Sequence, residues 1–105
     1  MTSVKIVTLN VRGLRDTNKR KAVFNWSKKN KFDIVFLQET YSSQSDENIW
    51  EREWGNAVIW SHGSKHSRGV AIVLGKNINI GVDNIHRDNN GRLAVMQVSI
   101  EETKF

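Results

Sequence analysis

Two short apolar runs, separated by a basic segment of helix length, constrain the fold of this chain more than any other feature. The first run is Val4–Leu9, which ends in Asn10, and the second is Asp33–Leu37, which leads into Glu39. The second run is apolar throughout, which is typical of a strand covered on both faces. Strand, helix and strand in about 35 residues predict a βαβ unit with two parallel strands.

The segment between the two runs predicts an amphipathic helix that begins at residues 16–18 and continues to about residue 30. Asp16, Thr17 and Asn18 are all suitable as the residue that caps its N-terminus. Ala22, Val23 and Trp26 share one arc of this helix, and we expect that arc to face the core.

The remainder of the chain predicts a second, short helix followed by four strands. Asp46 and Glu47 suit the first turn of this helix, and Trp50 and Trp54 then lie on one of its faces. The expected strands cover residues 57–60, 70–74, 78–82 and 93–100, with a hairpin turn at residues 90–91. We therefore expect an α/β fold with one βαβ unit, a second helix and several antiparallel strands. We assign the following aromatic side chains to the core: Phe24, Trp26, Phe32, Phe36, Trp50, Trp54 and Trp60.

Charge is distributed unevenly along the 105 residues, whose net charge is +5. Residues 1–31 contain nine Lys and Arg and one Asp, a local charge of +8, whereas the rest of the chain contains seven bases and ten acids. A basic first third is typical of a surface that binds phosphate, most often in nucleic acid. A solvated helix face that only keeps the protein soluble would produce the same pattern.

Composition excludes several classes of protein. The chain has no Cys, which excludes disulfides, thiolate catalysis and Cys-ligated zinc. No apolar run approaches the roughly 20 residues that a transmembrane helix needs. The first residues lack the pattern of a secretory signal, so we expect an intracellular location.

Polar side chains follow both strands of the predicted βαβ unit. Because ligands of parallel α/β sheets bind at the carboxyl ends of the strands, Asn10 and Glu39 are expected side by side at that edge. A carboxylate with a neighbouring amide suits Mg²⁺, which also takes water and substrate phosphates as ligands. Arg12, Arg15 and Lys19 are expected on the same side, where a phosphate would bind. The alternative is that Glu39 is an ordinary polar strand end and Asn10 a turn residue.

Three segments resemble one known family. They are Val-Thr-Leu-Asn10-Val-Arg-Gly-Leu14, Asp33-Ile-Val-Phe-Leu-Gln-Glu-Thr40 and Arg68-Gly-Val-Ala-Ile-Val-Leu74. Together they resemble the N-terminal half of the endonuclease/exonuclease/phosphatase superfamily. Within it, they are most similar to the endonuclease domains of LINE-type (non-LTR) retrotransposons.

The resemblance implies a four-layered, DNase I-like α/β sandwich that nicks DNA with Mg²⁺ or Mn²⁺. Glu39 matches the family's metal-ligating Glu, and Asn10 matches the Asn that helps to bind the metal and the scissile phosphate. The implied partner is DNA, with no membrane, and an intact relative would carry a reverse transcriptase domain on the same chain. A nuclear location follows from that role.

Residues near this edge are candidates for nucleic-acid binding. Repair-type relatives usually have Asp where this chain has Arg12, and a basic residue where it has Tyr41, so both departures favour the retrotransposon type. Tyr41 is expected either to flank a nucleotide or to play a structural role. The full candidate set is Arg12, Arg15, Lys19, Arg20, Tyr41 and Arg68.

The second half of the family pattern, with its Tyr, Asp-x-Asn and Ser-Asp-His, has no match in these residues. We interpret Asp88-Asn89-Asn90 as part of a turn, and we expect His62 and His66 to be loop residues without contacts. Residues 1–105 are thus expected to form a domain truncated before its C-terminal half and inactive alone. The alternatives are a phosphatase acting on a lipid or nucleotide phosphoester and a non-catalytic, basic nucleic-acid-binding fragment.

Overall fold

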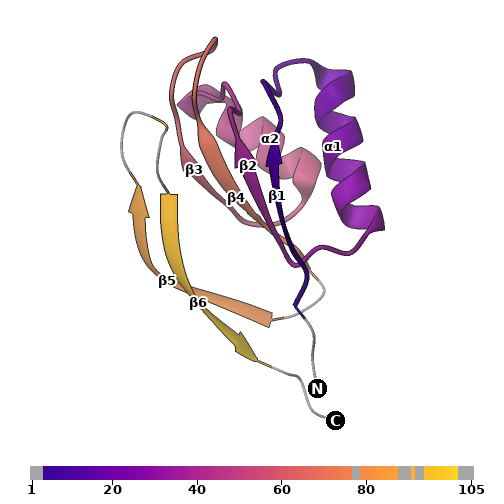
Figure 1. Ribbon diagram of the computed structural model, residues 1–105, viewed down its shortest axis with the longest axis vertical. Coiled ribbons are helices and arrows are strands. Elements are labelled where there is room, and N and C mark those ends of the chain that lie inside the picture. The colour runs from indigo at the N-terminus through magenta and orange to yellow at the C-terminus, as the bar shows by residue number, and fades with distance from the viewer. Residues whose placement is uncertain (1–3, 77–78, 88–90, 92–93, 102–105) are drawn as a thin grey trace.

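A mixed four-stranded sheet organises the chain in the computed structural model, which describes residues 4–76, 79–87, 91 and 94–101 (Figure 1). The elements, in chain order, are β1 (Ile6–Asn10), α1 (Thr17–Lys29), β2 (Ile34–Gln38), the 3-10 turn η1 (Gln44–Asp46), α2 (Glu47–Trp54), β3 (Val58–Ser61), β4 (Val70–Leu74), β5 (Asn79–Arg87) and β6 (Ala94–Glu101). No helix in these residues is long and apolar enough to cross a membrane.

The sheet has the strand order β1-β2-β4-β3. β1 and β2 are parallel, with Asn10 opposite Gln38, and β4 pairs antiparallel with both β2 and β3. β5 and β6 form a separate antiparallel pair. The predicted βαβ unit, second helix and antiparallel strands are therefore confirmed. The predicted turn at residues 88–90 lies outside the described residues.

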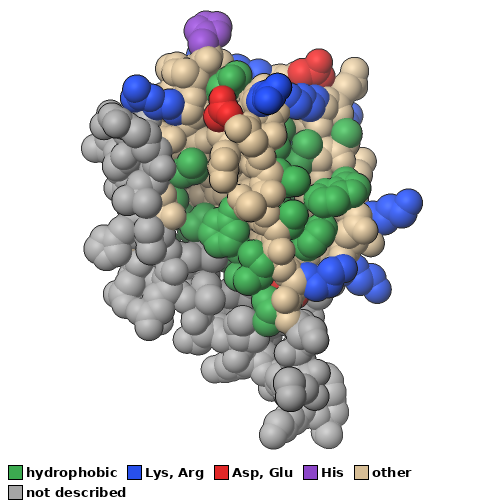
Figure 2. All heavy atoms as spheres, viewed as in Figure 1, with side chains coloured by type: hydrophobic (Ala, Val, Ile, Leu, Met, Phe, Trp, Pro, Cys, Tyr) green, Lys and Arg blue, Asp and Glu red, His purple; other side chains and the backbone are tan. Residues whose placement is uncertain are grey.

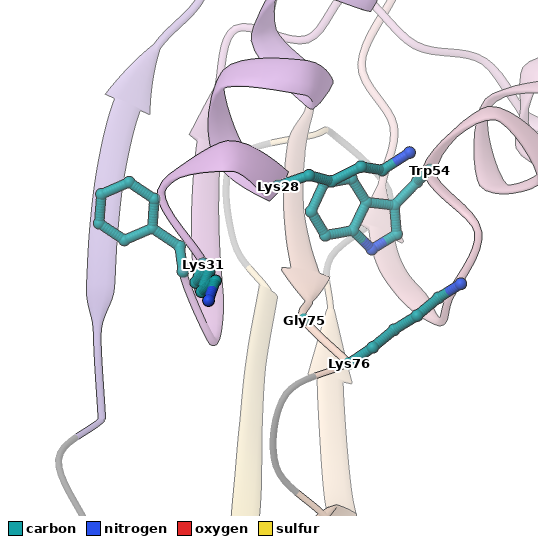
Figure 3. Close-up of a pocket in the computed structure, with 6 residues that line it drawn as sticks. Lys28, Lys31, Trp54, Gly75 and Lys76 are labelled. Carbon is teal, nitrogen blue, oxygen red and sulfur yellow. The ribbon is translucent and has the colours of Figure 1, made fainter.

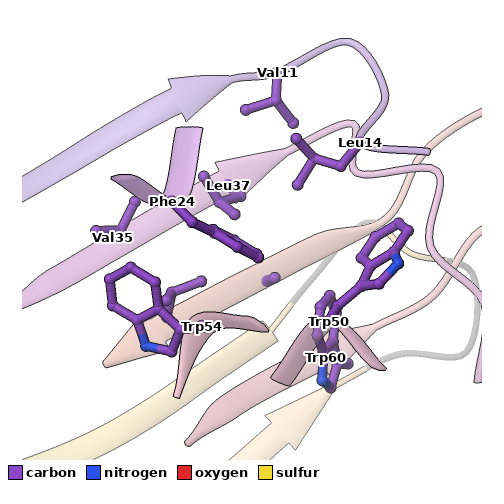
Figure 4. Packing of buried hydrophobic residues seen from close by; sticks show 10 residues of the cluster. Val11, Leu14, Phe24, Val35, Leu37, Trp50, Trp54 and Trp60 are labelled. Carbon is purple, nitrogen blue, oxygen red and sulfur yellow. The ribbon is translucent and has the colours of Figure 1, made fainter. Parts of the chain in front are cut away.

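Both faces of the central strands are covered, because alternate residues of an apolar strand point to opposite sides. Val35 and Leu37 of β2 pack with the aromatic side chains of α1 and α2, and Val11 and Leu14 from the loop after β1 join this cluster (Figure 4). Ile34 of β2 belongs to a second cluster on the opposite face, where Ala94 of β6 packs against it.

Helix α1 begins where the sequence predicts, but it buries a different face. The Asp16 carboxylate accepts hydrogen bonds from the backbone N–H groups of Asn18 and Lys19 and so caps the helix. The expected arc of Ala22, Val23 and Trp26 is wrong, because Ala22 and Trp26 are exposed. The buried side chains are those of Arg20, Phe24 and Ser27.

Two polar side chains occupy this buried face because each has partners inside the protein. The Ser27 hydroxyl donates to the carbonyl of Val23, one turn earlier. The Arg20 guanidinium pairs with the carboxylate of Glu53 on α2 at 2.9 Å and donates to the carbonyl of Leu14. Hydrophobic periodicity misplaces the face because it counts such satisfied polar groups as exposed.

The aromatic core is largely as expected. Phe24, Trp50, Trp54 and Trp60 are buried, with edge-to-face contacts between Phe24 and Trp54 and between Trp50 and Trp60 (Figure 4). The indole of Trp54 donates to the carbonyl of Leu74, so its polar group is satisfied. Phe32 and Phe36 are only partly buried. Trp26 does not belong to the core.

Candidate active site

The carboxyl edge of β1 and β2 brings Asn10 and Glu39 together. The side-chain amide of Asn10 donates to the Glu39 carboxylate, while its oxygen accepts from the backbone N–H of Arg12 at 3.2 Å. Both side chains remain accessible to solvent. Asn10 therefore fixes the direction of the Glu39 carboxylate, which remains accessible to a ligand.

The backbone around this pair is strained. Arg12, Glu39, Tyr41 and Arg68 adopt positive φ angles between 50° and 64°, a region that non-glycine residues rarely occupy. Within the described residues, only Lys31 among the other non-glycine positions shares this conformation. Each such residue costs about 1 kcal/mol or more and persists where the surroundings over-determine it, often at functional sites.

Hydrogen bonds between three loops hold this backbone in place. The Glu39 carbonyl accepts from the Gly13 N–H at 2.6 Å, which ties the end of β2 to the loop after β1. The Tyr41 N–H donates to the Arg68 carbonyl at 2.9 Å, which ties the same segment to the loop before β4. The orientation of Glu39 thus depends on residues far from it in the sequence.

A buried chain of side-chain hydrogen bonds continues from the residue after Glu39. The hydroxyls of Thr40 and Ser42 lie 2.8 Å apart and both residues are fully buried. The Ser42 hydroxyl is 2.8 Å from Nδ1 of His62, whose Nε2 is 2.6 Å from the Glu47 carboxylate. His62 also stacks on Trp60.

The expectation that His62 makes no contacts is therefore wrong. The spacing of His62 and His66 in the sequence does not indicate these hydrogen bonds, because the partners of His62 come from the segment after β2 and from the start of α2. This network of hydrogen bonds fixes the buried segment that follows Glu39. It does not supply a nucleophile, because the Ser42 hydroxyl is inaccessible to solvent.

A pocket of about 470 Å³ lies beside the Asn10–Glu39 pair. We call it the basic pocket; its lining residues are Arg12, Gly13, Arg15, Asp16, Lys19, Tyr41, Lys65 and His66. Four of the sequence candidates thus meet here, and the loop between β3 and β4 adds Lys65 and His66. Figure 2 shows basic side chains along the upper edge of the molecule, where α1 begins, with a histidine above them.

The remaining candidates are placed differently. Arg20 is buried and its guanidinium is committed to Glu53 and to main-chain carbonyls, so we assign it a structural role in place of the predicted contact with nucleic acid. Arg15 lines the basic pocket but pairs with Asp46 at 2.7 Å. Arg68 is exposed and does not line the pocket.

The Arg15–Asp46 pair makes stability depend on pH. Burial acts to raise the pKa of Asp46, but hydrogen bonds from Arg15 and Ser43 and the Arg15 charge outweigh it, so the pKa is lowered. A carboxyl with a lowered folded-state pKa binds fewer protons folded than unfolded. Its stabilising contribution is thus present above the unfolded value of about 3.9 and is lost as the pH falls through the folded value.

We expect Asp46→Asn to lower the free energy of unfolding by about 1–2 kcal/mol at neutral pH. This is less than a fully buried hydrogen bond between charged groups would contribute, because solvent screens the partly exposed Arg15. Urea unfolding should show this difference shrinking as the pH falls below about 4. Gln44→Ala, at an exposed neighbour in the same turn, is the control. A difference that stays constant down to acidic pH would contradict the assignment.

The donor atoms at this edge fit a hard divalent cation. Mg²⁺ prefers oxygen ligands and commonly takes one or two carboxylates, completing its shell with water and substrate phosphates. Glu39 offers one such carboxylate, partly exposed and oriented by Asn10. In the described part of the chain no group of three or more His, Cys, Asp or Glu could hold a metal.

An oriented carboxylate at the carboxyl edge of the sheet, beside a basic pocket, suits an α/β protein that binds phosphate groups. A sequence model described as "Endonuclease/Exonuclease/phosphatase family" matches residues 7–91. The chain belongs to this family, as the resemblance implied. Its mixed sheet with a βαβ start and two helices is consistent with part of a DNase I-like fold.

One similar curated protein is the Transposon TX1 uncharacterized 149 kDa protein of Xenopus laevis. It is 29% identical over 72 residues, which are 69% of this chain and 6% of that protein. This chain therefore corresponds to a small part of its relative. A transposon protein among the relatives agrees with the predicted resemblance to retrotransposon endonuclease domains.

Proposed function

We propose that this chain supplies the metal- and phosphate-binding half of an endonuclease that nicks DNA, of the retrotransposon type. The observation that carries the proposal is the hydrogen-bonded Asn10–Glu39 pair, which is accessible to solvent at the carboxyl edge beside the basic pocket. Family membership supports hydrolysis of phosphate esters as the reaction class.

The residues of this edge divide the work. Mg²⁺ or Mn²⁺, when bound, would neutralise charge on the phosphoryl oxygens and on the leaving oxygen. Glu39 would hold the cation, and Asn10 would keep the carboxylate oriented. Arg12, Lys19 and Lys65 would attract the DNA backbone into the basic pocket, because exposed basic groups there release counterions from phosphates.

DNA is favoured over a small phosphoester by the shape and charge of the basic pocket. The pocket is open to solvent, and its basic residues come from the loop after β1, the start of α1 and the loop between β3 and β4. A long polyanion can contact both loops at once. The phosphatase alternative would need a more enclosed site, and the relative named for a transposon also favours DNA.

We further propose that the 105 residues do not cleave DNA by themselves. The Tyr, Asp-x-Asn and Ser-Asp-His that the resemblance assigns to nucleophile and phosphate positioning have no match in this sequence. In an intact relative a reverse transcriptase domain would then extend the nicked end, in the nucleus. Nicking of supercoiled plasmid by the purified chain, lost in Glu39→Gln, would contradict the inactivity but not the endonuclease assignment.

Metal binding is the direct test of the site. We expect Mg²⁺ at about 100 times Kd to raise the thermal midpoint of the wild-type chain by roughly 10 °C or more, since binding at that concentration adds about 2.7 kcal/mol. Glu39→Gln should abolish this response while melting normally without metal. Glu51→Gln is the matched control, because Glu51 is a partly exposed carboxylate outside the edge, and a glutamine there can still accept from the Trp60 indole. An equal Mg²⁺ response in wild type and Glu39→Gln would refute the metal site.

Substrate binding separates the alternatives. Affinity for duplex DNA that depends on Mg²⁺ and on Arg12 and Lys65 supports the endonuclease. Affinity that falls steeply with salt but is indifferent to Mg²⁺ and to Glu39→Gln would support the non-catalytic binding fragment instead. Preferential binding of a nucleotide or lipid headgroup would support the phosphatase.

A further inference from the structure

A second pocket, of about 240 Å³, lies at the opposite edge of the sheet from Asn10 and Glu39. We call it the lysine pocket; its lining residues are Lys28, Lys31, Phe32, Trp54, Gly75 and Lys76. They come from the end of α1, the entry to β2, the end of α2 and the residues after β4. Figure 3 shows Lys28 beside the indole of Trp54, with Lys76 extending below it.

The charges of this pocket are not balanced by carboxylates. No acidic residue lines it, and none of its three lysines takes part in an ion pair within the described residues. The ammonium of Lys28 lies 5.4 Å from the centre of the Trp54 ring and donates to the main-chain carbonyl of Glu53. The three lysines bring positive charge to the wall of one hollow with no carboxylate lining it, so an anion bound there would be stabilised.

An exposed indole adjoins the lysine pocket. Trp26 is 43% exposed, and its ring packs at 5.1 Å from Phe32, which also lines the pocket. The ammonium of Lys5 lies 5.1 Å from the centre of the same Phe32 ring. Large aromatic side chains usually bury most of their surface, so Trp26, tilted at 38° against Phe32, presents an unusually exposed aromatic ring beside the cations.

We propose that the lysine pocket and Trp26 form a second nucleic-acid site, which binds a single strand. Single-stranded nucleic acid combines a row of phosphates with unpaired bases, and proteins bind it with basic grooves and aromatic rings. Lys31 and Lys76 contact the phosphates, and Trp26 stacks on a base. A duplex fits poorly, because its bases are already stacked inside the helix. The inference goes beyond the proposed endonuclease and does not depend on the metal site.

The test compares two pairs of charge-removing substitutions in the full chain, without metal. Lys31→Gln with Lys76→Gln removes two ammonium groups of the lysine pocket. Lys21→Gln with Lys29→Gln removes two exposed charges from α1 that line neither pocket. Fluorescence anisotropy gives Kd for labelled oligothymidylate, oligouridylate and a DNA duplex, and circular dichroism checks that each variant folds.

We expect the lysine-pocket pair to weaken single-strand binding and to reduce its log–log salt slope by roughly 1.4, about 0.7 for each lost phosphate contact. Trp26→Ala should weaken single-strand binding by about fivefold or more. A base that stacks on Trp26 should also quench part of the protein's Trp fluorescence on binding, and Trp26→Ala should remove that part. The control pair should leave the single-strand affinity and its salt slope nearly unchanged. Whichever oligonucleotide binds more tightly identifies the strand as DNA or RNA.

Equal loss of single-strand affinity in both pairs would overturn the proposal, because it would show only a general effect of charge. Equal loss of duplex and single-strand affinity in the lysine-pocket pair would also overturn it. A third variant, Arg12→Gln with Lys65→Gln, separates the two sites. Measured with Mg²⁺ present, it should weaken duplex binding at the basic pocket while single-strand binding and Trp26 quenching remain.

Discussion

Replacing Arg20 with alanine is expected to lower the free energy of unfolding by about 3–5 kcal/mol, because it leaves a mostly buried carboxylate without its partner. The Arg20 guanidinium makes a forked contact with Glu53, with nitrogen–oxygen distances of 2.9 to 3.3 Å, and also donates to the Leu14 carbonyl. It therefore joins α1, α2 and the loop that follows β1. Thermal and urea unfolding should both show the loss.

The matched control is Lys21→Ala, at the next residue of α1, which is exposed and should change stability by no more than about 0.5 kcal/mol. Arg20→Lys should recover only part of the loss, because an ammonium cannot reproduce the fork. Arg20→Met with Glu53→Leu should be more stable than Arg20→Ala, since no buried charge remains. If Arg20→Ala has the same free energy of unfolding as the wild type, the Arg20–Glu53 ion pair does not stabilise the fold as proposed.

The second large effect is expected at Gly69, where alanine should cost about 2–4 kcal/mol from backbone strain and overpacking combined. Gly69 has φ of +94°, and a Cβ there would overlap with Oγ1 of Thr40, which is fully buried. The Gly69 carbonyl also accepts from the Thr40 N–H at 3.0 Å. Displacement of Thr40 would move Glu39, so the Mg²⁺-dependent rise in melting temperature should be lost as well.

Gly55 provides the control for the backbone contribution. It has the same φ of +94°, but a Cβ there would meet only the flexible side chain of Lys76, at 3.1 Å from Nζ. Gly55→Ala should therefore cost only about 1 kcal/mol and leave the Mg²⁺ response intact. Equal losses at the two glycines would mean that contact with Thr40 does not matter.

Much of the fold follows from local pattern. The continuous apolar run ending at Leu37 predicted a strand covered on both faces, and Ile34 and Val35 do lie in clusters on opposite sides of the sheet. The polar residues directly after β1 and β2 predicted that Asn10 and Glu39 would meet, because parallel strands end at the same edge. The first inference rests on the two-residue alternation of side chains along a strand, and the second on the shared direction of two parallel strands. Both can be read from the sequence.

Other features depend on pairs that local pattern does not encode. Arg20 and Ser27 occupy the buried face of α1 while Trp26 lies outside, because partners for the polar groups come from Glu53 and from the helix backbone. The partners of His62, Ser42 and Glu47, lie 20 and 15 residues away along the chain. No periodicity connects them.

The sequence by itself therefore determined the class of fold, the family and the edge where Asn10 and Glu39 meet. Only the tertiary structure decided which basic side chains are available to a ligand. Arg20 forms an interior ion pair with Glu53, whereas Lys65 and His66 lie with Arg12 at the basic pocket. The physical reason is that strand and helix patterns are local. The availability of a charge depends on which opposite charge folding brings within about 4 Å of it.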